Sequence, residues 1–161
     1  AGFPGRVPLS WQIAEVGDVN ADGKTDVIWQ NTTSGLVAVW LMNGLTVTSV
    51  GFPGSTPNGW VIAGTGDLNG NGTADLVWHN ITTGKVALWL MNGATIASAG
   101  FPGGVSLNWH IAQVGDVNAD GRADVIWRNR TSGVVAVWMM NGMSIGSVGF
   151  PGTAPTDWEI Q

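Results

Sequence analysis

The segment Asp18-Val19-Asn20-Ala21-Asp22-Gly23-Lys24-Thr25-Asp26 decides how this 161-residue chain folds, because the chain carries two more versions of it at intervals of 49 residues. The other versions run from Asp67 to Asp75 and from Asp116 to Asp124. Each has an Asp or Asn at its first, third, fifth and ninth positions and a glycine at its sixth. A fixed period of this length indicates a repeat protein in which each period is one structural unit.

The tryptophans follow the same period. Trp11 recurs as Trp60, Trp109 and Trp158, and two further series, starting at Trp29 and Trp40, account for the rest of the ten tryptophans. We therefore divide the chain into whole units and two partial ones. The whole units are residues 11–59, 60–108 and 109–157; residues 1–10 repeat the end of a preceding unit, and residues 158–161 begin a further one.

Each unit contains four short segments rich in Val, Ile and Trp, which favour β-strands. The dipeptide Asn43-Gly44 predicts a type I′ hairpin turn, because both central residues of that turn need a positive φ. Pro53 and Gly54 predict the end of the last strand. No period of 3.6 residues indicates a helix. In the first unit the predicted strands are residues 11–16, 26–30, 37–42 and 45–50.

The third predicted strand, Val37–Met42, is apolar on both alternating faces, so we expect both faces of its sheet to be covered. This predicts an all-β fold, a β-propeller with about three four-stranded blades. Propeller rings have roughly four to eight blades. We therefore expect the ring to be completed by oligomerisation, most simply a homodimer, or by a longer parent chain. Residues 1–13 and 148–160 share one register, so closure requires an end segment to be exchanged, displaced or left loose.

The acidic loops are typical of calcium sites. Calcium takes six to eight oxygen ligands in irregular geometry, and glycine at the sixth position permits a sharp bend. Eight of the eleven acidic residues lie in these loops. We expect up to three Ca²⁺ ions per chain. Each loop supplies four side chains and, at its seventh position, one backbone carbonyl. The predicted ligands are Asp18, Asn20, Asp22, Lys24 and Asp26 in the first loop; Asp67, Asn69, Asn71, Thr73 and Asp75 in the second; and Asp116, Asn118, Asp120, Arg122 and Asp124 in the third.

Two other loop types have similar acidic residues. An EF-hand needs a glutamate at the twelfth position, where the first loop has Trp29. The remaining alternative is a turn of Asp, Asn and Gly whose side chains bond only to backbone amides. Asn71 replaces an aspartate that the other two loops carry at this position, so we expect the second calcium site to be the weakest.

The segment from Gly17 to Asp26, between Ile13-Ala14 and Val27-Ile28-Trp29, resembles the FG-GAP or VCBS-type repeat of integrin-like β-propellers. The resemblance covers nearly the whole chain in three copies. It implies one blade per repeat, calcium in the loop between the first two strands, and a secreted or extracellular protein. Members include adhesion heads, modules of secreted enzymes and lectins with pockets between blades. Trp11 stands near where integrin-type repeats carry Phe-Gly, and the Trp-rich version resembles bacterial and fungal propeller lectins.

Two repeat positions are candidates for ligand binding. The tryptophans that follow Pro-containing loops begin strands and can reach an edge, where aromatic rings commonly line pockets. A second position is polar among apolar neighbours; either it is exposed near a blade end, or it is a pocket position that differs between blades. The candidates are Trp11, Trp60 and Trp109 at the first position, and Gln30, His79 and Arg128 at the second. We expect Trp29, Trp40 and their counterparts to fill the core.

Composition narrows the function further. The net charge is −5 and basic residues are few and scattered, which argues against nucleic acid. No apolar stretch approaches the ~20 residues of a membrane span. No Ser–His–Asp set, Cys–His pair or acidic pair outside the loops indicates an enzyme. We expect a secreted, calcium-binding propeller module that binds carbohydrate as a lectin does. The alternative is a calcium-stabilised structural or adhesion module that binds protein.

Overall fold

The computed structural model describes residues 6–161, which form three four-stranded antiparallel sheets. The first sheet contains β1 (Trp11–Gly17), β2 (Asp26–Asn31), β3 (Leu36–Asn43) and β4 (Thr46–Ser55). The second contains β5 (Trp60–Gly66), β6 (Asp75–Asn80), β7 (Lys85–Asn92) and β8 (Thr95–Gly104). The third contains β9 (Trp109–Gly115), β10 (Asp124–Asn129), β11 (Val134–Asn141) and β12 (Ser144–Thr153). The prediction of an all-β fold with three four-stranded sheets is confirmed.

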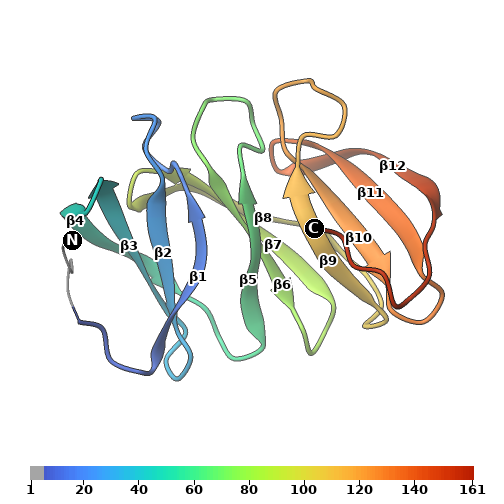
Figure 1. Cartoon of the computed structure of the whole chain (residues 1–161), viewed down its shortest axis with the longest axis horizontal. Coiled ribbons are helices and arrows are strands. Elements are labelled where there is room, and N and C mark those ends of the chain that lie inside the picture. Colours follow the sequence, from blue (N-terminus) through green and yellow to red (C-terminus); the bar gives the residue numbers. More distant parts are fainter. Residues whose placement is uncertain (1–5) are drawn as a thin grey trace.

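The sheets stand side by side in chain order (Figure 1), and we call them blades 1, 2 and 3. Within each blade the strands pair in the order in which they occur along the chain. The first strands of neighbouring blades are in contact, β1 with β5 and β5 with β9. The acidic loops that follow β1, β5 and β9 lie along the same edge of the array. Residues 1–5 of the predicted segment 1–10 lie outside the described residues.

The fourth strand is longer than the sequence indicated. Pro53 and Gly54 do not end β4, which continues to Ser55. The pairing with β3 shifts register here, since Val37 lies opposite Gly54 while Val39 lies opposite Gly51. Phe52 and Pro53 fall within this irregularity on the outermost strand, where a missing N–H costs no ladder hydrogen bond. The prediction that the last strand ends at Pro53 and Gly54 is therefore wrong.

The hairpin between β3 and β4 also differs from the prediction. Asn43 pairs with Thr46, so the two loop residues are Gly44 and Leu45. Only Gly44 has a positive φ, of 61°, which is the pattern of a type II′ turn with glycine first. The predicted type I′ turn centred on Asn43-Gly44 is wrong by one residue. Both turns suit the right-handed twist of the strands, so the hairpin itself was predicted correctly.

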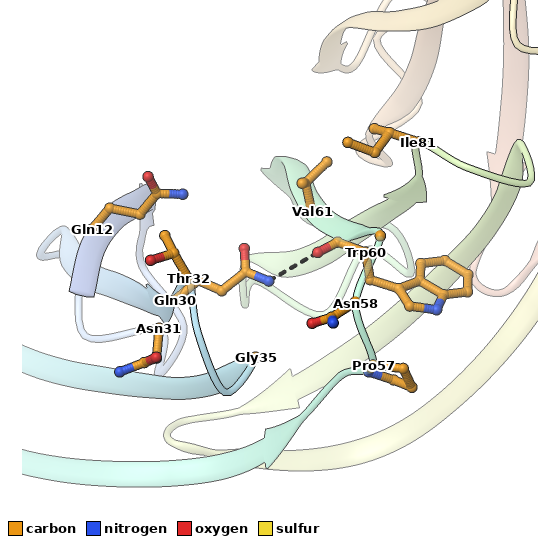
Figure 2. A pocket seen from close by; sticks show the side chains of 11 residues that line it. Gln12, Gln30, Asn31, Thr32, Gly35, Pro57, Asn58, Trp60, Val61 and Ile81 are labelled. Atoms are coloured by element: carbon orange, nitrogen blue, oxygen red, sulfur yellow. Dashed lines mark hydrogen bonds between the residues drawn. The ribbon is translucent and has the colours of Figure 1, made fainter. Parts of the chain in front are cut away.

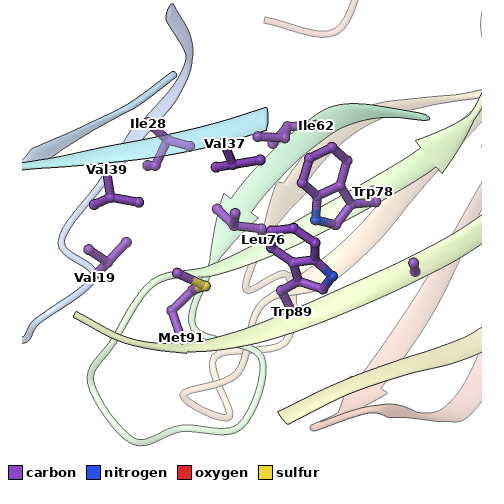
Figure 3. Packing of buried hydrophobic residues seen from close by; sticks show 10 residues of the cluster. Val19, Ile28, Val37, Val39, Ile62, Leu76, Trp78, Trp89 and Met91 are labelled. Carbon is purple, nitrogen blue, oxygen red and sulfur yellow. The ribbon is translucent and has the colours of Figure 1, made fainter. Parts of the chain in front are cut away.

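The core lies between blades, and each blade uses its two faces differently. Alternate residues of a strand point to opposite faces. From blade 1 the aliphatic side chains Ile28, Val37 and Val39 point toward blade 2. From blade 2 Trp78 and Trp89 point back at them (Figure 3). We call the two sides of a blade its aliphatic face and its Trp face.

The same joint is formed again between blades 2 and 3. Val77, Val86 and Leu88 of blade 2 are fully buried against Trp127 and Trp138 of blade 3. The expected core role of these tryptophans is thus confirmed in blades 2 and 3. In blade 1 the corresponding Trp29 and Trp40 are only partly buried, because within the described residues no blade precedes them. The described residues form no helix that is long and apolar enough to cross a membrane.

Candidate functional site

The acidic loops are organised by hydrogen bonds from their own backbone. In the first loop the Asp18 carboxylate accepts the amides of Asp22, at 3.2 Å, and Gly23, at 2.8 Å. The Asn20 side-chain oxygen accepts the Asp22 amide at 3.1 Å. The Asp22 carboxylate accepts the Lys24 amide at 2.9 Å. The third loop repeats these bonds at Asp116, Asn118 and Asp120.

The second loop follows the same plan with small differences. Asp67 accepts the amides of Gly70, Asn71 and Gly72 at 2.7–3.1 Å. Asn69 and Asn71 accept the amides two residues further on, as their counterparts do. The Asn71 oxygen also accepts the Thr73 hydroxyl at 2.6 Å, a bond made possible by the threonine of this loop.

The ninth residue of each loop has a separate structural role. Asp26 is fully buried, and its two oxygens accept the amides of Val19, at 3.1 Å, and Met42, at 2.9 Å. It thereby ties the acidic loop to the end of β3. Asp75 bonds Leu68 and Met91 in the same way, and Asp124 bonds Val117 and Met140.

Burial opposes the charge on two of these carboxylates, Asp75 and Asp26. It raises the pKa of Asp75 to about 6 from an ordinary 3.8, although the amides of Met91 and Leu68 favour the ionised form and partly offset it. Burial also raises the pKa of Asp26, against the same kind of amide bonds. By contrast, the amide of Lys24 is the main cause that lowers the pKa of the exposed Asp22. The Asp22 carboxylate therefore favours the charged state that a cation needs.

The donor set fits calcium in part. A carboxylate has about four lone-pair positions, so Asp18 and Asp22 keep acceptor capacity after binding the loop amides. Asn20 and the carbonyl of Lys24 add oxygen donors of the kind that calcium prefers. Both Asp26 oxygens already accept amide hydrogen bonds, from Val19 and Met42. Within residues 6–161 no three acidic or histidine side chains converge as a metal cage. The amide bonds of the alternative turn interpretation are present, and they leave lone pairs free.

A small polar cavity lies between blades 1 and 2 (Figure 2). Its volume is about 170 Å³, and its lining includes Gln12, Asn31 and Asn58. The side-chain amide of Gln30 crosses the boundary between blades and donates to the backbone carbonyl of Trp60 at 3.0 Å. Two predicted ligand-binding residues thus meet, but through a bond that Gln30 makes to the backbone of Trp60.

The position shared by Gln30, His79 and Arg128 is buried, with 5–6% of each residue exposed. Of the two alternatives for this position, exposure near a blade end is therefore wrong. Arg128 repeats the role of Gln30 and donates to the carbonyl of Trp158. His79 instead packs edge-on against Trp127, with ring centroids 5.3 Å apart. Its buried Nε2 has no partner among the described residues, and burial is the main cause of its lowered pKa.

The indole of Trp60 lines a second, wider groove. Trp60 and Phe101 lie with ring centroids 6.1 Å apart, and Lys85 adds a positive charge. The groove measures about 510 Å³, within the ~300–1,000 Å³ range of small-molecule pockets. Trp11 forms a similar pair with Phe52 at 6.4 Å. Trp109 is half-buried and packs against the core between blades 2 and 3.

Sequence reasoning missed Phe101 and Lys85 as site residues. A signal for Phe101 was present, because Gly-Phe-Pro-Gly recurs at residues 2–5, 51–54, 100–103 and 149–152. A phenylalanine at the same position of every unit is the signal of an aromatic contact that recurs from blade to blade, as Trp11–Phe52 and Trp60–Phe101 do. Lys85 gave no comparable signal, since the corresponding residues are Leu36 and Val134.

Stacked four-stranded blades with an acidic loop between their first two strands define this molecule as a protein of propeller-type repeats. Residues 18–78 and 67–127 each match the family model described as FG-GAP-like repeat. The matches together span more than half of the chain, which therefore belongs to the FG-GAP-like repeat family. The comparison with curated proteins gave no match. The FG-GAP part of the resemblance is confirmed.

Proposed function

We propose that this chain is a secreted, calcium-stabilised module that binds carbohydrate and has no catalytic role. The observation that carries the carbohydrate part is the groove in which Trp60 and Phe101 form an aromatic wall beside Lys85. Aromatic rings with a few polar groups are the usual lining of small-molecule sites. The bond from Gln30 to the Trp60 carbonyl supports the tryptophan from the neighbouring blade.

Calcium binding is the second part of the proposal. Asp18, Asn20 and Asp22 would hold the ion in the first loop, together with the carbonyl of Lys24. The loop is already bent by hydrogen bonds to the same side chains, so binding costs little further ordering. Bound calcium would neutralise the Asp18–Asp22 pair and stabilise the edge of each blade. An extracellular location suits such a module, since calcium sites of extracellular domains bind at roughly 10⁻⁴–10⁻³ M.

The calcium part predicts a ranking of sites. Titration calorimetry of the calcium-free protein should resolve two similar sites and a weaker one in the second loop, where Asn71 supplies no charge. Asn71→Asp should tighten that site about tenfold, equivalent to ~1.4 kcal/mol. The reciprocal variant Asp22→Asn should weaken the first site to the level of the second. A calorimetric titration that shows no binding heat, with the protein fully folded, would contradict calcium binding. Tightest binding at the second loop would contradict the ranking.

The carbohydrate part predicts a selective loss of affinity. A glycan array should first identify a binding sugar, whose affinity is then measured by calorimetry. Phe101→Ala, at a side chain that is 74% exposed, should weaken binding about 2- to 13-fold, since an aromatic contact contributes ~0.5–1.5 kcal/mol. Gln12→Ala, in the small polar cavity, is the matched control and should bind normally. If the folded protein binds no glycan on the array, the structural or adhesion module is favoured.

A further inference from the structure

The ends of the array carry the two halves of the joint that holds the blades together. Among residues 6–161, no blade covers the Trp face of blade 1, where Trp29 and Trp40 line a cavity of about 170 Å³ together with residues 6–8. No blade within these residues covers the aliphatic face of blade 3 either, and this face borders a groove of about 520 Å³. The side chains that line this groove include Ile126, Val135, Val137, Met139 and Phe150. Inside the chain, faces of these two kinds bury each other twice.

Glycines on the aliphatic faces mark where the next blade makes close contact. A Cβ added to Gly17 would lie 2.9 Å from the Cβ of Ala74, and one added to Gly51 would lie 2.4 Å from the Cβ of Ala94. Blade 2 repeats this with Gly66 at 2.6 Å from Ala123. In blade 3 the corresponding Gly115 and Gly149, and also Gly152, have nothing within 4 Å among the described residues.

Backbone hydrogen bonds between blades show the same gap. The carbonyls of Asp18 and Val19 accept the amides of Ala74, at 2.7 Å, and Gly93, at 2.8 Å. Blade 2 makes the equivalent bonds to blade 3 from Asp67 and Leu68. The equivalent carbonyls in blade 3 belong to Asp116 and Val117, and the equivalent amides in blade 1 belong to Thr25 and Gly44. Among residues 6–161 these four groups have no such backbone partner.

We propose that the occupant of both open faces is a second copy of this chain. Its Trp face seats on the aliphatic face of blade 3, so that Thr25 approaches Gly115 and Leu45 approaches Gly149. The Thr25 and Gly44 amides then donate to the Asp116 and Val117 carbonyls. The reciprocal contact forms at the other end, and the two copies close a ring of six blades. Six lies within the roughly four to eight blades of known propellers, whereas three copies would give nine.

The C-terminal segment is displaced in this assembly. Trp158 has the register of Trp11, and its carbonyl accepts a hydrogen bond from Arg128. In the ring, Trp11 of the second copy takes this place, as Trp60 does beside Gln30. Residues 158–161 belong to no strand, whereas Trp11 is held in β1 by pairing with Asn31. Because residues 1–13 and 148–160 share one register, the displaced segment runs from Ala154 to Gln161. Arg128 then exchanges the carbonyls of Ala154, Pro155 and Trp158 for the equivalent carbonyls of Val7, Pro8 and Trp11 of the second copy.

Solution mass tests the proposal directly. Light scattering on the full chain at micromolar concentration should give twice the chain mass of 16.7 kDa. Gly149→Val should give 16.7 kDa with an unchanged circular dichroism spectrum, because in one chain this side chain meets open space but in the ring it meets Leu45. Thr153→Val, on the same strand but outside the open face, should remain dimeric. A monomeric parent chain, or a dimer unaffected by Gly149→Val, overturns the proposal.

Engineered cysteines test which faces meet. The chain has no cysteine, so Leu45→Cys combined with Gly149→Cys introduces the only thiols. Under mild oxidation the double variant should form covalent dimers and no larger species, while each single variant should stay uncrosslinked. A ladder of higher multimers would mean an open filament, and crosslinking of either single variant would mean a face paired with itself. Either result overturns the closed head-to-tail ring.

Discussion

Replacing Trp78 with alanine is expected to lower the free energy of unfolding by about 3–5 kcal/mol, the usual cost of removing a fully buried aromatic side chain. Trp78 has no exposed surface and packs against Trp89 with ring centroids 4.8 Å apart. It also fills the joint between blades 1 and 2, so its loss opens a cavity at the core. Urea denaturation at a fixed protein concentration, followed by circular dichroism, measures the change.

Two further variants make the Trp78 result specific. Trp158→Ala removes the same side chain where it is 65% exposed, and it should change stability by less than about 1 kcal/mol. Trp78→Phe should cost much less than Trp78→Ala, because it keeps an aromatic ring. It also removes an indole N–H that is buried without a partner in the described part of the chain. Equal losses for Trp78→Ala and Trp158→Ala would contradict the assignment of Trp78 to the core.

The second large effect is expected at Asp75. Asp75→Ala leaves the buried amides of Leu68 and Met91 without their acceptors. Each unsatisfied buried donor costs about 1–3 kcal/mol, so the total loss for the two amides should be about 2–6 kcal/mol. The comparison variant is Asp67→Ala, whose amide partners lie in an exposed loop where water can replace the carboxylate. Without calcium, Asp67→Ala should lose less than half as much stability.

The two aspartates should also respond differently to calcium and to pH. Asp67→Ala should abolish the calcium-induced rise in stability of its loop, whereas Asp75→Ala should be destabilised with or without calcium. Because the folded-state pKa of Asp75 is raised from 3.8 to about 6, the folded state holds this proton more tightly than the unfolded state. The contribution of Asp75 to stability is therefore greatest below pH 4 and declines as the pH rises to 6. The opposite result would be a free energy of unfolding that increases from pH 4 to pH 6 in the parent chain but not in Asp75→Asn. Such an increase would contradict the expected direction of the pH dependence.

The repeat made most of the fold predictable from sequence. Tryptophans in three series, apolar residues on both faces of Val37–Met42 and acidic loops at a fixed period are local patterns, and they predicted three four-stranded sheets. The errors arose where pairing with a neighbouring strand decides the outcome. Pro53 is tolerated because β4 is outermost and bulged there, and Gly44-Leu45 form the turn because Asn43 pairs with Thr46.

The site was less predictable because its geometry depends on contacts between repeats. Gln30 appeared polar and exposed, yet it is buried against the carbonyl of Trp60, which is 30 residues further along the chain. Asp26 appeared equivalent to Asp18, yet only the folded blade brings the amides of Val19 and Met42 to its two oxygens. A periodic pattern shows which residues are equivalent, but not which neighbouring unit each one contacts.

Every joint between blades uses the same two faces, the aliphatic face and the Trp face, whatever the number of blades. Each unit presents the same pair of faces. Inserting or deleting the coding segment of one 49-residue unit therefore leaves the two end faces of the array complementary to each other. Tandem duplication of the segment that encodes residues 11–157 would join the six blades of the proposed ring in one polypeptide, without any new contact having to evolve. Such an architecture can change its valency in one genetic step, while point mutations at positions such as Gln30, His79 and Arg128 diversify the individual seams.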